Sequence, residues 1–143
     1  MKNPQSFFMA AGDSACYALQ LYNVAQKIGL AAPMNEQAAI ELGIESGVIE
    51  YHAENWHHPR NFLVIDAGKF VTILTMRRYA ARWDSANYKA KPGEHVIQFW
   101  AKSKANADKG IGHFDAPDYH TLQRSVTVET GKVYSTRVIY PKG

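Results

Sequence analysis

The chain contains a single cysteine, Cys16, and its neighbours favour a reactive thiol. Gly12, Asp13 and Ser14 precede it. Glycine permits a sharp turn, and Asp or Ser accepts hydrogen bonds at the N-cap of a helix. A thiol one turn into such a helix faces unpaired backbone N–H groups and the positive end of the helix dipole, which favour the thiolate. We therefore expect Cys16 to act as a nucleophile, which requires a base and a group that orients the base.

His95 and Asp115 are the expected base and orienting group. They lie in two strand-like segments, 95–100 and 110–115, which are joined by the polar loop 101–109. In a symmetric antiparallel hairpin His95 lies directly opposite Asp115, close enough to hydrogen bond. Asp115 would then fix the tautomer of His95, and His95 would take the proton from Cys16. A slip of one residue in the hairpin would break this pairing.

His113 is the alternative base. It lies two positions before Asp115 on the same strand face, about 7 Å away, which is too far for a direct bond along the strand. Asp118 or His120 could orient it instead. We favour His95, and the choice between the two histidines stays open.

The elements that must position these groups begin with a helix over Ser14–Ile28, which ends at Gly29. Its apolar stripe contains Ala18, Leu21, Ala25 and Ile28. At 100° per residue, Cys16, Gln20, Asn23 and Lys27 fall together on the opposite side. The pattern predicts that Cys16 lies on the polar side of this helix, away from the core.

The rest of the chain predicts an α+β domain. We expect a second helix over Glu36–Leu42, and segment 62–78 favours a helix and strands equally. Strands are expected at 95–100, 110–115, 125–129 and 132–140, the last two joined by a tight turn at Thr130–Gly131. Helices therefore come first, and an antiparallel sheet follows from about Tyr88.

This order of residues resembles the papain-like cysteine peptidase superfamily. The resemblance is strongest to small bacterial and phage members such as double-glycine leader peptidases and NlpC-type wall endopeptidases. It is carried by Gly12-Asp13-Ser14-Ala15-Cys16, His95-Val96-Ile97 and Asp115-Ala116-Pro117, and by the closing hairpin. It implies an N-terminal helix carrying the Cys packed on a C-terminal sheet. The implied activity is a thiol hydrolase that cleaves a peptide, isopeptide or related amide through an acyl-enzyme on Cys16.

One feature departs from that family. Such enzymes usually carry a Gln about six residues before the Cys as an oxyanion donor, and Ala10 stands there instead. Gln5 and Gln20 are the replacement candidates. The alternative function is a catalytically inactive papain-like binding module, and a basic nucleic-acid-binding accessory protein is a more distant third.

Composition fits a single domain over residues 1–143, with 46% hydrophobic and 20% charged residues. We expect a cytoplasmic protein, because one cysteine excludes an internal disulfide and the short N-terminal apolar run is unlike a signal peptide. The net charge of +3 is too small to indicate a nucleic-acid partner, and no apolar run is long enough to cross a membrane. The histidines of segment 52–58 match no closed zinc pattern. The expected partner is a peptide-like substrate, with no metal or cofactor.

Overall fold

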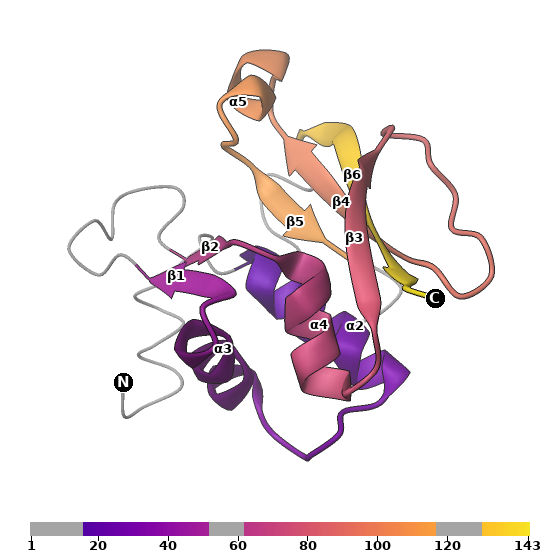
Figure 1. The fold of residues 1–143 in the computed structure, drawn as a ribbon. Helices are drawn as coiled ribbons and strands as arrows, with labels where there is room; N and C mark the ends of the chain where they lie inside the picture. The colour runs from indigo at the N-terminus through magenta and orange to yellow at the C-terminus, as the bar shows by residue number, and fades with distance from the viewer. Residues whose placement is uncertain (1–15, 52–61, 117–129) are drawn as a thin grey trace.

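The structure, a computed structural model, describes residues 16–51, 62–116 and 130–143 (Figure 1). Its helices are α2 (Cys16–Ile28), α3 (Glu36–Glu45), α4 (Ala67–Thr75) and α5 (Lys104–Asp108). Its strands are β1 (Ile49–Tyr51), β2 (Phe62–Val64), β3 (Tyr79–Asp84), β4 (His95–Ala101), β5 (His113–Asp115) and β6 (Lys132–Pro141). The predicted α+β class is confirmed, with the helix that carries Cys16 ahead of a sheet in the C-terminal half.

Four antiparallel strands form the main sheet in the order β3-β6-β4-β5. β6 is central, since it pairs with β3 on one side and with β4 on the other. β1 and β2 form a separate antiparallel pair. Among the described strands, the last one along the chain therefore lies inside the sheet, and β5 lies at one edge.

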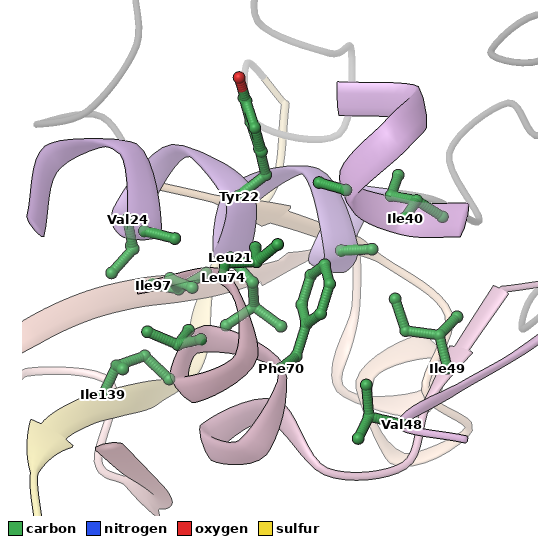
Figure 2. Packing of buried hydrophobic residues seen from close by; sticks show 14 of the residues in the cluster. Leu21, Tyr22, Val24, Ile40, Val48, Ile49, Phe70, Leu74, Ile97 and Ile139 are labelled. Carbon is green, nitrogen blue, oxygen red and sulfur yellow. The ribbon is translucent and has the colours of Figure 1, made fainter. Parts of the chain in front are cut away.

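The core lies between one face of the sheet and the helices. Figure 2 shows Leu21 of α2, Leu74 of α4 and Ile97 of β4 lying together, and all three side chains are fully buried. Ile139 of β6 and Phe70 of α4 belong to the same cluster. The helix α2 is central in this packing, since it contacts α3, α4 and β5.

Local sequence explains where the helices begin and end. Asn35 and Asp66 cap α3 and α4, since their side chains accept hydrogen bonds from the backbone N–H groups of Ala38 and Lys69. The helix α2 ends as predicted at Gly29, whose φ of 127° suits glycine. No helix in the described segments has the length and apolar character needed to cross a membrane.

Several element predictions need adjustment. The second helix extends to Glu45, and segment 62–78 contains both β2 and α4. The sheet also begins earlier than predicted, since β3 starts at Tyr79. Strand 132–140 is confirmed as β6, whereas its expected hairpin partner, 125–129, lies outside the described residues.

Candidate active site

Cys16 is the first residue of α2, and its side chain lies against the edge strand β5. The backbone N–H of Phe114 donates a hydrogen bond to the Sγ atom of Cys16, with 3.3 Å between N and Sγ. The ring of Phe114 also stacks on the ring of Tyr17, with 4.2 Å between their centroids. An edge strand directs some of its backbone N–H groups away from the sheet, which leaves the Phe114 N–H available to the thiol. These contacts join the start of α2 to β5.

The prediction that Cys16 lies on the polar side of its helix, away from the core, is wrong, because that side of the helix is buried around Cys16. Only 7% of Cys16 and 6% of Gln20 are exposed, while Lys27 on the same predicted side remains exposed. Strand β5 packs along the first turns of α2 and covers the side that carries Cys16. The apolar stripe of a helix predicts only the face that packs on the main core. A central helix such as α2 contacts several elements, so some of its polar residues are buried too.

Cys16 lies in the wall of a cleft of about 810 Å³. Tyr17, Phe99, Phe114 and Trp83 form aromatic parts of its wall, and Cys16 itself lines it. A cleft of this volume and apolar character is in the range that binds small molecules or short peptide segments. Cys16 therefore has both a polar contact and an adjacent space that a ligand can occupy.

His113 directly precedes Phe114, which contacts the thiol. Two covalent bonds separate the Cα atom of His113 from the backbone N atom of Phe114, which donates to Cys16 Sγ. The Cα atom of His113 therefore lies within about 6 Å of Sγ. Alternation along β5 places the His113 side chain on the face of Asp115, opposite to that of Phe114. Of the two histidines considered, His113 is the one whose backbone lies beside Cys16.

The predicted pairing of His95 with Asp115 is wrong. Asp115 lies opposite Gln98, and His95 lies opposite Ile139 of the other neighbouring strand. Since Phe99 pairs with Phe114, Asp115 lies on the sheet face opposite to that of Phe99 and His95. The symmetric register fails because α5 occupies the connection and β5 starts only at His113.

His95 lies toward the other end of the sheet. It is four residues from Phe99, the partner of Phe114, which is about 13 Å along β4. Its ring lies 6.3 Å from the ring of Tyr79 between centroids. Burial lowers the pKa of His95 below its ordinary value.

The other predicted site residues are distributed as follows. Asp115 is buried two residues after His113, on the same face of β5. Gln20 is buried one turn after Cys16, and its Oε1 accepts a hydrogen bond from Asn23 Nδ2 at 3.3 Å. Gln5, the two possible partners of His113 (Asp118 and His120), and the histidines of segment 52–58 lie outside the described residues. Within the described segments no group of three or more His, Cys, Asp or Glu residues could hold a metal.

Arg137 is a residue of the cleft that the sequence analysis missed. It lies in the middle of β6, is 6% exposed and lines the same cleft as Cys16. Burial lowers the pKa of Arg137 to about 10. A signal was present in the sequence, since alternation in strand 132–140 places Arg137 on the same face as the apolar Ile139. An arginine at an inward-facing strand position is a candidate functional residue.

Comparison of the chain with protein-family models, with curated proteins and with solved structures gives no match.

Proposed function

We propose that the chain is a papain-like thiol hydrolase in which Cys16 is the nucleophile and His113 is the base. The hydrogen bond from Phe114 N–H to Cys16 Sγ carries this proposal, because it fixes the thiol beside the residue that follows His113. The helix-then-sheet order of the fold is compatible with the papain-like resemblance. His95 lies about 13 Å along β4 from Phe99, the partner of Phe114, so His113 replaces His95 in the proposed pair.

The proposed reaction cleaves an amide bond in two steps. His113 takes the proton from Cys16, and Sγ attacks the carbonyl carbon of the substrate. The resulting tetrahedral oxyanion collapses as His113 gives the proton to the leaving amine, which produces an acyl-enzyme. Water then attacks the thioester carbonyl while His113 takes one of its protons. The C–S bond breaks, the carboxylic acid is released, and the proton on His113 returns to Sγ.

Backbone groups supply the electrostatic support that this chemistry needs. The Phe114 N–H already points at Sγ and would stabilise the thiolate, since hydrogen bonds to charged acceptors are the strong ones. Backbone N–H groups in the first turn of a helix are suited to hold an oxyanion. Gln20, one turn later on the same side of α2, is the side-chain candidate for that role.

One observation favours the alternative, a binding module without turnover. Cys16 is only 7% exposed, so a substrate carbonyl must enter the cleft to reach Sγ. A binding module would need only the cleft, because its ligand would not have to reach Sγ.

Alkylation of Cys16 by iodoacetamide separates these two functions, and a single cysteine makes the label specific. The rate is measured against pH in the wild type, in His113→Ala and in the matched control His95→Ala. A thiolate–imidazolium pair predicts a wild-type midpoint well below 8.5, the usual pKa of a cysteine thiol. It also predicts a shift toward 8.5 in His113→Ala and an unchanged profile in His95→Ala.

Two outcomes would contradict the assignment. A shift in His95→Ala alone would make His95 the base. Three superimposable profiles with midpoints near 8.5 would support the binding module instead.

A further inference from the structure

The guanidinium of Arg137 is buried in the cleft with no acidic partner among the described residues. Its Nη1 donates to Ser135 Oγ at 2.8 Å and to the Thr136 carbonyl oxygen at 3.4 Å. No acceptor in the described segments receives a hydrogen bond from its remaining N–H groups, and no carboxylate there lies within ion-pair distance. A buried charge is normally paired, because removing it from water is unfavourable.

Aromatic rings cover the faces of this guanidinium. Its Cζ lies 3.4 Å from the ring centroid of Trp83, 5.2 Å from that of Phe114 and 5.7 Å from that of Phe99. Rings stacked on the faces of a guanidinium leave its in-plane N–H groups as the donors for a ligand. The edge of a guanidinium matches a planar carboxylate, which accepts two parallel hydrogen bonds from it.

Arg137 and Cys16 share a close neighbour, Phe114. Its ring contacts the guanidinium, and its backbone N–H contacts Sγ. Both residues also line the same cleft. A ligand held by Arg137 would therefore extend beside the thiol.

We propose that Arg137 forms a carboxylate-binding subsite in the Cys16 cleft, for a ligand that carries its carboxylate next to an aromatic or apolar group. The subsite itself requires only the arrangement of Arg137 and its rings. Its assignment to the substrate of a hydrolase rests on the proposed function. In a peptide, the carboxylate could come from the chain terminus or from an acidic side chain.

Benzoate is the probe for this subsite, and benzamide is its neutral counterpart of nearly the same shape. Binding to the full chain is measured by calorimetry and by the ¹H–¹⁵N resonance of the Arg137 Nε–H group. We expect saturable benzoate binding that moves this resonance, and benzamide binding at least tenfold weaker. Equal binding of benzoate and benzamide would overturn the proposal.

The matched variants are Arg137→Met and Arg77→Met, which remove one positive charge each. Arg77 is exposed and does not line the cleft, so Arg77→Met should bind benzoate like the wild type. Arg137→Met should bind it at least tenfold more weakly. Equal weakening in both variants would mean that net charge alone attracts the anion, and it would overturn the subsite. If Arg137→Met does not fold, Arg137→Lys is the substitute, because it keeps the charge, loses the two-pronged donor and should weaken binding severalfold.

Competition with benzoate then identifies the source of the carboxylate. N-acetylphenylalanine presents a terminal carboxylate, and N-acetylglutamate α-amide presents a side-chain carboxylate. Displacement by either one supports the subsite and names the source. Inorganic phosphate that displaces benzoate more strongly than both would overturn the specificity for a planar carboxylate.

The benzoate assay does not depend on the reactivity of Cys16. Benzoate binding together with an unreactive thiol would therefore reject the hydrolase and keep the subsite. A reactive thiol without benzoate binding would reject the subsite and keep the hydrolase.

Discussion

The backbone N–H of Phe114 donates to Sγ of Cys16 across 98 positions of the chain. The bond joins the first turn of α2 to the edge strand β5, so the thiol is part of the tertiary structure as well as of the candidate site. Substitutions at Cys16 therefore test stability and activity together, and two of them separate the effects.

Cys16→Ser should abolish amide cleavage but fold nearly as stably as the wild type, because a hydroxyl oxygen also accepts a hydrogen bond from Phe114. Cys16→Ala leaves this N–H without its acceptor and should lower the free energy of unfolding by about 1 kcal/mol. Urea denaturation measures both values. An alanine variant as stable as the serine variant would show that the bond contributes nothing to stability.

Gly112→Ala should destabilise the fold, because Gly112 packs closely against β4. A Cβ atom at this position would lie 2.2 Å from the Trp100 carbonyl oxygen and 2.7 Å from the ring of Phe99. Relieving such a clash costs about 1–3 kcal/mol. Gly143→Ala is the control, since nothing lies within 4 Å of its Cβ. Equal denaturation midpoints for the two variants would argue against this packing.

His95 should make the stability depend on pH in a defined window. Burial lowers the pKa of His95 from 6.5, so below 6.5 the unfolded chain holds more protons than the folded one. Stability should fall as the pH decreases from about 6.5 through the folded-state pKa of His95. In His95→Gln the free energy of unfolding should vary less between about pH 7 and pH 5. The exposed Lys27→Gln variant should keep the wild-type slope, and an equal slope in His95→Gln would refute the expectation.

Trp83 and Arg137 should be energetically coupled. Trp83 is 73% exposed, yet its ring lies 3.4 Å from Arg137 Cζ. A cation–π contact of this kind is worth on the order of 1 kcal/mol. Trp83→Leu should therefore cost about 1 kcal/mol in the wild type and less in Arg137→Met. Additive effects in this double-mutant cycle would show that the stacking contributes nothing.

The local elements were largely predictable from the sequence. The apolar spacing and Gly29 predict the end of α2, and the β-rich residues from His95 and from Lys132 predict β4 and β6. These features follow from periodicity and capping within one short segment, which sequence reasoning can evaluate.

The site was predictable only in part, because it depends on contacts between segments. Gln98 lies opposite Asp115 because the connection between β4 and β5 contains the helix α5. The predicted symmetric hairpin assumed a loop without a helix. The burial of Cys16 is likewise set by β5, far away in the sequence. Cys16 and His113 were named from the sequence, while the contact of the next residue, Phe114, with Cys16 required the tertiary structure.

The central place of β6 also determines when the cleft can form during synthesis. A nascent chain that has not yet reached residue 132 contains β3 and β4 but lacks the strand that lies between them. It also lacks Arg137, while Cys16 has already been made. The thiol therefore emerges from the ribosome long before its cleft exists, so the cleft is completed after translation of β6. Until then the ribosome-bound chain contains Cys16 without the β6 residues that line the cleft, Tyr134, Ser135 and Arg137.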